Sequence, residues 1–249
     1  MRPKGAFAKS FPMAFPRRAS HAETMFTRNL GIALLSLAVT GLFAADDAGW
    51  KPLFNGKNLD GWTQKGGVAK YRFENGEMIG AAQPNTPNTF LCTTRDYTNF
   101  ILEVEFKVAE GLNSGVQIRS HAYPTNTQIE WNGKTVKVPA NRVHGYQVEI
   151  DTTARAWSGG IYEEGRRGWM NDLTKNDAAR KAFKHNDWNK YHIEAVGDSL
   201  KTTINGVPAA DLKDSQDASG FIALQVHGVG KNTNDLEIRF RNVRIKELP

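Results

Sequence analysis

The sequence has 249 residues, a single cysteine and a formal net charge of +6 at pH 7. One cysteine excludes an intramolecular disulfide and any zinc site built from several cysteines. Residues 1–44 carry six of the 32 Lys and Arg and one of the 26 Asp and Glu, which leaves 26 basic and 25 acidic side chains in residues 45–249. The positive charge therefore belongs to the leader, and nucleic-acid binding, which requires a basic surface, is not expected.

The leader has the organisation of a secretory signal peptide. Residues 30–44 form an uncharged, mostly apolar run that follows Arg28 and ends in small residues, with Met25 as the natural start. The run is shorter than the roughly twenty residues of a membrane helix, although a retained membrane anchor is the alternative. We predict that residues 1–44 are removed, that the protein is secreted or periplasmic with no membrane attachment after cleavage, and that residues 45–249 form a single domain.

Beyond residue 50, short segments of alternating apolar and polar residues are separated by turn dipeptides such as Asn55-Gly56 and Asn75-Gly76. We predict about twelve strands, among them residues 71–74, 77–80, 88–94, 100–108, 116–120, 145–151, 188–196, 201–204, 207–210, 220–228 and 236–245. Residues 120–144 and 155–187 are long connections, and residues 177–183 are the one helix expected after the leader. This pattern predicts an all-β fold, an antiparallel β-sandwich or jelly roll with at most one or two short helices.

The strand at residues 145–151 has an unusual polar face. Tyr146, Val148 and Ile150 alternate with Gln147, Glu149 and Asp151. Two carboxylates in line on one strand face repel each other unless a substrate, a metal or a basic partner uses them.

Two other strands carry similar polar rows, Gln117 with Arg119 and Gln225 with His227. If the three strands share one sheet, their polar faces form one groove. Amides, carboxylates, Arg and His together suit the hydroxyl and carbonyl groups of a sugar. The further candidates for contact with a sugar are Asn113, Trp131 and Tyr162.

The same residues have structural alternatives. Glu149 and Asp151 could simply be ion-paired to Arg119 within the sheet, Arg119 could be only a structural clamp, and His227 could be a satisfied structural histidine. Elsewhere, we expect Cys92 to be buried, Glu103, Glu105 and Lys107 to form a solvated or cross-strand-paired face, and Trp50, Trp62 and Trp188 to lie in the core.

Several motifs occur in an order that resembles one known family. They are Leu53-Phe54-Asn55-Gly56-Lys57-Asn58-Leu59-Asp60-Gly61-Trp62, Asn113-Ser114-Gly115-Val116-Gln117-Ile118-Arg119, residues 145–151, Ile204-Asn205-Gly206, residues 220–228 and Phe240-Arg241-Asn242-Val243-Arg244-Ile245. Over roughly residues 50–248 the chain is similar to the 3-keto-disaccharide hydrolase domain family. The resemblance implies a concanavalin-like jelly roll, an exported bacterial protein, and cleavage of glycosides that are oxidised to a ketone at carbon 3.

Cleavage of such a glycoside by elimination needs a base, an acid and a group that stabilises an enolate. We expect Glu149 or His227 as base or acid, Asp151 as their partner, and Arg119 with Gln147 or Gln225 on the carbonyl oxygen. No cofactor is firmly expected, although a divalent cation held by Glu149, Asp151 and His227 could replace the arginine.

Two other functions remain open. Residues two apart on a strand are separated by about 6.5–7 Å, near the carboxylate spacing of inverting glycosidases, so Glu149 and Asp151 could serve a conventional glycoside hydrolase. The same fold also serves lectins, so a non-catalytic carbohydrate-binding module is the second alternative. In each case the partner is a carbohydrate, and the sequence gives neither the sugar and linkage nor the oligomeric state.

Overall fold

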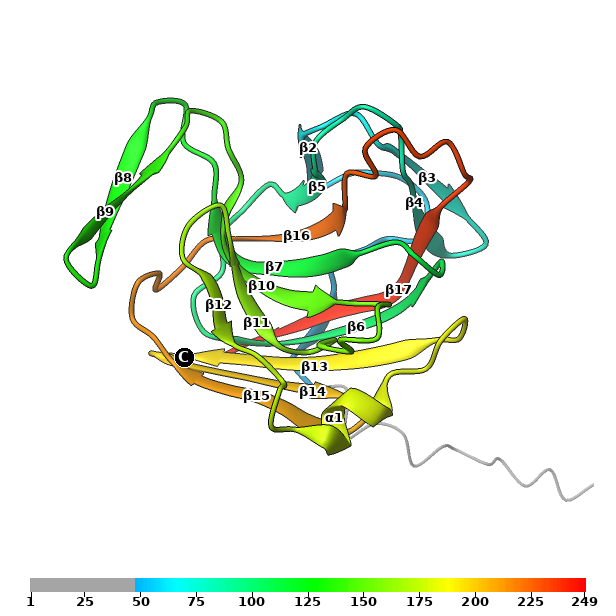
Figure 1. The fold of residues 1–249 in the computed structure, drawn as a ribbon. Helices are drawn as coiled ribbons and strands as arrows, with labels where there is room; N and C mark the ends of the chain where they lie inside the picture. The colour runs from blue at the N-terminus through cyan, green and yellow to red at the C-terminus, as the bar shows by residue number, and fades with distance from the viewer. Residues whose placement is uncertain (1–47) are drawn as a thin grey trace, which may run out of the picture. The chain divides into compact units, whose positions relative to one another are not determined.

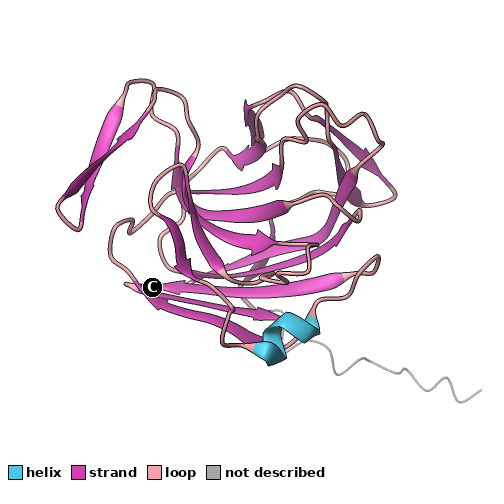
Figure 2. Ribbon diagram, in the orientation of Figure 1, coloured by secondary structure: helices cyan, strands magenta, loops and turns pink. Residues whose placement is uncertain are grey.

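The structure, a computed structural model, describes residues 48–249. Two antiparallel sheets pack against each other, and a separate two-stranded hairpin extends beside them (Figure 1). Within the described residues there is one α-helix, α1 (Asp177–Ala182), and strands dominate everything else (Figure 2). The predicted all-β antiparallel sandwich is therefore confirmed, and so is the helix, whose N-cap Asn176 accepts a hydrogen bond from the main-chain nitrogen of Ala179 at 3.1 Å.

The first sheet has eight strands. In spatial order they are β15 (Val207–Lys213), β14 (Ser199–Ile204), β13 (Asn189–Val196), β6 (Phe100–Val108), β17 (Glu237–Glu247), β4 (Glu77–Ala81) and β3 (Lys70–Glu74), with β1 (Trp50–Pro52) paired to β17.

The second sheet has seven strands. Their order is β12 (Gly168–Asn171), β11 (Ile161–Glu164), β10 (His144–Ile150), β7 (Ser114–His121), β16 (Phe221–Val226), β5 (Thr89–Thr93) and β2 (Trp62–Gly66). The two long connections contain structure of their own: the first holds the hairpin of β8 (Thr127–Trp131) and β9 (Lys134–Val138), and the second holds β11, β12 and α1.

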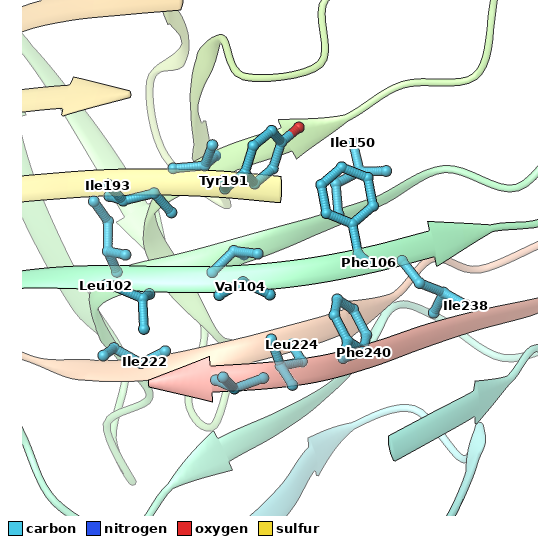
Figure 3. Close-up of a cluster of buried hydrophobic side chains, with 14 of the residues drawn as sticks. Leu102, Val104, Phe106, Ile150, Tyr191, Ile193, Ile222, Leu224, Ile238 and Phe240 are labelled. Atoms are coloured by element: carbon cyan, nitrogen blue, oxygen red, sulfur yellow. The ribbon is translucent and has the colours of Figure 1, made fainter. Parts of the chain in front are cut away.

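Alternate residues of both sheets meet in a continuous apolar core. Figure 3 shows Leu102, Val104 and Phe106 of β6 among side chains from β13, β16 and β17. Burial of these side chains supplies the main stabilising free energy, about 1.5–3 kcal/mol for each large residue. Since the inner positions of β7, β10 and β16 are apolar too, their polar residues must point to the other face of the second sheet.

The outer face of the first sheet is paired as expected. Glu103 contacts Arg244 at 2.8 Å, and Glu105 contacts Arg241 at 2.7 Å. Trp62 and Cys92 are buried as predicted, but the prediction for Trp50 and Trp188 is wrong. These two indoles are only half-buried on this outer face, where the guanidinium carbons of Arg244 and Arg241 lie 4.6 Å and 3.8 Å from their ring centres.

The predicted signal peptide and the rest of the leader lie outside the described residues. No helix between residues 48 and 249 is long and apolar enough to cross a membrane.

Candidate functional site

The polar side chains of β7, β10 and β16 do gather on one face of the second sheet. Strand β7 lies between the other two, with Gln117 opposite Gln147 of β10 and Ala223 of β16. Because neighbouring strands are about 4.8 Å apart, β10 and β16 are separated by roughly 10 Å, the width of a sugar ring with its substituents. The amide side chains of the three strands, Gln117, Gln147 and Gln225, meet on one face as predicted.

Three amides form a directed network on this face. Gln147 accepts hydrogen bonds at its Oε1 from Gln117 at 2.6 Å and from Gln225 at 2.9 Å, and its Nε2 donates to Glu149 at 2.7 Å. The lack of a side chain at Gly115 makes this possible, since a Cβ there would lie 2.5 Å from the Cγ and Cδ of Gln147. The network fixes the orientation of Gln147, so its amide N–H always points at the carboxyl group of Glu149.

Glu149 is the most perturbed carboxyl group of the site. Its Oε1 accepts a hydrogen bond from Asn113 at 2.6 Å, and Tyr191 of the first sheet donates a short hydrogen bond to its main-chain carbonyl. The residue is only 5% exposed. Burial raises the pKa of Glu149 to about 7, although the hydrogen bonds and a nearby arginine oppose the shift. A carboxyl group with this pKa can give or take a proton at neutral pH.

Asp151 lies below the surface of the site. Its carboxylate accepts hydrogen bonds from the main chain and hydroxyl of Thr153, from the main-chain nitrogen of Trp157 and from Nε of Arg155. Burial alone would raise the pKa of Asp151, but these donors outweigh it and lower the pKa. The carboxylate is therefore engaged in holding the turn after β10, and the expected pairing of Asp151 with Glu149 as two acid–base groups is not what the geometry supports.

That turn presents Arg155, which the sequence analysis did not single out. Its Nε lies 2.9 Å from Oδ2 of Asp151, and its Nη2 lies 3.4 Å from Oε1 of Glu149. The guanidinium carbon is 4.8 Å and 4.9 Å from the ring centres of Trp157 and Trp169. A cation held by an aspartate and two indoles is well oriented, and its fork of N–H donors suits a carbonyl or enolate oxygen.

Arg119, by contrast, is not in the site. A β-bulge in β7 gives it a φ of 45°, and its buried guanidinium donates to the carbonyls of Thr98 at 2.8 Å and Gly197 at 2.6 Å. Ser120 lies next to Gln117 in its stead, with its hydroxyl 2.7 Å from Oε1 of Gln117. The expectation that Arg119 reaches the carbonyl of a substrate from the groove is therefore corrected, and the alternative of a structural clamp fits its contacts.

His227 follows β16, on the opposite side of β7 from Glu149. Its Nδ1 lies 2.8 Å from the carbonyl oxygen of Gly228. A carbonyl can only accept, so this contact places a proton on Nδ1 and leaves Nε2 as the nitrogen that exchanges its proton with a ligand.

Gln147, Glu149, Arg155 and His227 line a cleft of about 410 Å³. Its walls are formed by Asn88, Asn113, Arg142, Gln147, Glu149, Arg155, Tyr162, Glu164, Trp169 and His227. Gln117 and Gln225, expected to contact the substrate, are fully buried and are not part of the lining, because their amides are used to hold Gln147. Arg142 and Glu164 form an ion pair at 2.7 Å that sequence reasoning missed. Tyr162 lies in the cleft as expected, whereas Trp131 is in the projecting hairpin and is not part of the lining.

Glu149, Asp151 and His227 do not form a metal-binding group. In the part of the chain that the structure describes, no cluster of three or more His, Cys, Asp or Glu side chains has a suitable arrangement. The physical reason at this position is that both oxygens of Asp151 are engaged by donors of its own turn.

The described residues form a sandwich of two antiparallel sheets with a polar cleft on one face, an architecture that lectin domains share. The sequence of residues 49–246 matches the 3-keto-alpha-glucoside-1,2-lyase-like domain, and the chain belongs to this family. It is thus a carbohydrate-related protein, of glycosyl-hydrolase-like or carbohydrate-binding type. Among curated proteins, none matches the sequence.

Solved structures are similar in fold. A candidate glycosyl hydrolase from Parabacteroides distasonis ATCC 8503 superposes with a TM-score of 0.52 at 17% identity, covering 81% of this chain and 94% of that one. A protein of unknown function with a galectin-like fold from Bacillus subtilis gives a TM-score of 0.54 at 12% identity, covering 80% and 94%. At these identities the likeness supports the sandwich fold alone.

Proposed function

We propose that the protein is an exported enzyme that cleaves glycosides carrying a ketone at carbon 3 of the sugar, by elimination followed by addition of water. The observation that carries the proposal is Glu149, a buried carboxyl group with a pKa of about 7, placed across the cleft from the exchangeable nitrogen of His227. Family membership supports the keto sugar as substrate.

The ketone makes the hydrogen on carbon 2 acidic, and the proposed first step uses this. The carboxylate of Glu149 takes the hydrogen as a proton, and the C–H electron pair forms the enolate, whose charge falls on the oxygen at carbon 3. Arg155, 3.4 Å from the same carboxylate, donates N–H groups to that oxygen. Fixed donors that meet developing charge of this kind are worth about 10²–10³ in rate.

In the second step the enolate electrons return, a double bond forms between carbons 1 and 2, and the bond from carbon 1 to the aglycone oxygen breaks. Protonated His227 gives its Nε2 proton to that oxygen. Water then adds to carbon 1 with Nε2 of His227 as base, while Glu149 returns its proton to carbon 2. An α-linked aglycone is anti to the hydrogen on carbon 2, which suits an acid and a base on opposite sides of β7.

The test is the fate of a deuterium label at carbon 2 during cleavage of a methyl 3-keto-glucoside in ordinary water. Elimination breaks the bond between carbon 2 and deuterium, so the label should lower kcat/KM relative to the unlabelled compound, and it is lost wherever Glu149 exchanges with water before it returns the proton. Glu149→Gln should lower kcat at least about a hundredfold because the base is lost. Glu130→Gln, an exposed carboxyl on the projecting hairpin, is the matched control and should turn over normally.

Each alternative has its own outcome. Cleavage at the same rate for the deuterated and the unlabelled compound with complete retention of the label, or equal turnover of the unoxidised glucoside, would show a conventional glycoside hydrolase. Sugar binding with no turnover of either substrate would show a carbohydrate-binding module, a function compatible with the amides and aromatic rings of the cleft.

A further inference from the structure

A second cavity adjoins the cleft on the side of His227. It has a volume of about 530 Å³ and lies between residues 86–90, residues 139–143 and the glycines that follow β16. Asn88 and Arg142 line both spaces, so the two are neighbours that share these residues as a wall. We call the second space the apolar annex.

The annex differs from the cleft in chemistry. Pro87, Phe90, Pro139, Ala140 and Val143 supply most of its side-chain wall. Phe90 and Val143 belong to a buried apolar cluster on this face of the second sheet, together with Cys92, Phe221 and Ala223. The lining of the annex contains no Asp, Glu, Lys or His, and Arg142 is its one charged residue. The outer face of the second sheet is thus divided into a polar part under the cleft and an apolar part under the annex.

Glycines let the wall of the annex pack closely. Gly66 and Gly228 pack against the segment at residues 86–88, where an added Cβ would lie 2.5 Å from the carbonyl oxygen of Asn88 and 2.7 Å from that of Thr86. The lining also includes polar side chains, those of Thr86, Asn88, Asn141 and Arg142. Against the apolar part of the wall a hydrocarbon is stabilised by leaving water, whereas the hydroxyl groups of a second sugar would find no hydrogen-bond partner there.

We propose that the annex binds the leaving group of the substrate, and that this aglycone is apolar, an alkyl or aryl group, instead of a second sugar. The inference rests on the function proposed above. The order of groups along the surface supports it: Arg155 meets carbon 3, Glu149 meets carbon 2, and His227 meets the aglycone oxygen. Gly228, directly after His227, already lines the annex, so the group expelled from carbon 1 enters it.

The experiment compares three 3-keto-glucosides, with methyl, hexyl and glucosyl aglycones. Methanol and hexanol are similar leaving groups, so a difference in kcat/KM between them reports binding of the chain. We expect the hexyl compound to exceed the methyl compound at least about tenfold, since each buried methylene contributes favourably, and to exceed the disaccharide. Calorimetric binding to the Glu149→Gln variant should give the same order of affinity without turnover.

The matched pair of variants is Ala140→Asp in the annex and Ala178→Asp on the exposed side of α1. Ala140→Asp should reduce the hexyl-to-methyl ratio to below about threefold, because a carboxylate opposes burial of hydrocarbon. A new carboxylate could also pair with Arg142 and change the turnover of every substrate, and the methyl glycoside controls for this because its aglycone does not fill the annex. Ala178→Asp should leave the hexyl-to-methyl ratio unchanged.

The outcomes separate the two proposals. Turnover of the methyl compound with no gain for hexyl, or a preference for the disaccharide, would overturn the apolar aglycone and leave the elimination intact. If no 3-keto-glucoside is cleaved, the proposed function fails, and binding to Glu149→Gln still decides the annex: equal affinities for methyl and hexyl compounds would refute it.

Discussion

Arg155 and Glu149 are coupled at the level of single residues. The carboxyl group of Glu149 is desolvated, which raises its pKa to about 7, and the guanidinium 3.4 Å away is one of the groups that limit the rise. The same guanidinium is the donor that we assign to the enolate. Arg155 therefore sets both the strength of the base and the stability of the charge that the base creates.

We expect Arg155→Met to lower kcat about a hundredfold or more through loss of the enolate donor. The base must be ionised, so activity falls as pH drops through the pKa of Glu149. Removing the cation raises this pKa, and the acidic limb of the kcat profile should move to higher pH. The measurement is kcat against pH for a 3-keto-glucoside, with Arg72→Met on the first sheet as control. An unmoved limb would mean that Arg155 does not act on Glu149.

The sequence predicts some of these residues and misses others for local reasons. Period-two alternation places Gln117, Gln147, Glu149 and Gln225 on the correct face, because β10 and the relevant part of β7 are regular. It does not show that Gln117 and Gln225 are buried beneath the cleft and do not line it. The alternation fails at Arg119, where a bulge with positive φ turns the side chain away from the cleft. No sequence motif predicts this bulge. Arg155 was not predicted because its position depends on a turn that Asp151 organises from four hydrogen bonds.

At the level of secondary-structure elements, strand β7 lies between β10 and β16, and its Gly115 leaves room for side-chain hydrogen bonds between the three strands. The side chain of Gln147 crosses over Gly115 to meet Gln117 and Glu149. The strands themselves were largely predictable from alternation and Asn-Gly turns. The hairpin β8–β9, which pairs with neither sheet, was anticipated only as a long connection, although Ile129, Val136 and Val138 alternate with polar residues on either side of the turn at residues 132–133.

Gly115→Ala should displace the side chain of Gln147, since the added methyl group would lie 2.5 Å from its Cγ and Cδ. We expect a loss of about 1–3 kcal/mol in the free energy of unfolding and a fall in kcat as Glu149 loses its donor. The measurement is denaturant unfolding with steady-state kinetics.

A double-mutant cycle supplies the control for the glycine. If the clash with Gln147 causes the instability, Gly115→Ala combined with Gln147→Ala should cost less than the sum of the two single changes. Full additivity of the two unfolding free energies would contradict the role assigned to Gly115.

At the level of the whole domain, the end of the sandwich away from Glu149 is held by buried charge. Glu163 contacts Arg166 at 2.8 Å and Arg167 at 2.5 Å, and Arg166 also meets Asp217, which lies 3.2 Å from His121. Burial lowers the pKa of the nearby His144 to about 4. The fold thus contains groups that resist protonation at one end and a carboxyl group that resists ionisation in the cleft.

These opposite shifts predict how stability depends on pH. His144 has a folded pKa of about 4, below its ordinary 6.5, so the unfolded chain takes up the proton first and stability falls as pH drops from 6.5 to 4. Asp214 and Asp217 have lowered pKa values as well and add to this acid limb. Glu149 behaves in the reverse way: the unfolded carboxyl ionises near 4.5 and the folded one near 7, so stability falls as pH rises between these values.

Among the described carboxyl groups whose pKa is shifted, Glu149 alone has a raised pKa. Substitution of this one residue should therefore remove the fall in stability as pH rises toward 7. Glu149→Gln cannot ionise, and its unfolding free energy relative to wild type should rise by about 2–3 kcal/mol between pH 5 and pH 8. Urea unfolding at several pH values measures this, and the acid limb should remain in the variant. Glu130→Gln, with an exposed side chain, should leave the profile unchanged. If the unfolding free energies of wild type and Glu149→Gln change with pH in parallel, folding does not raise the pKa of the Glu149 carboxyl group. The cleft would then lack the group that exchanges a proton at neutral pH, on which the proposed chemistry depends.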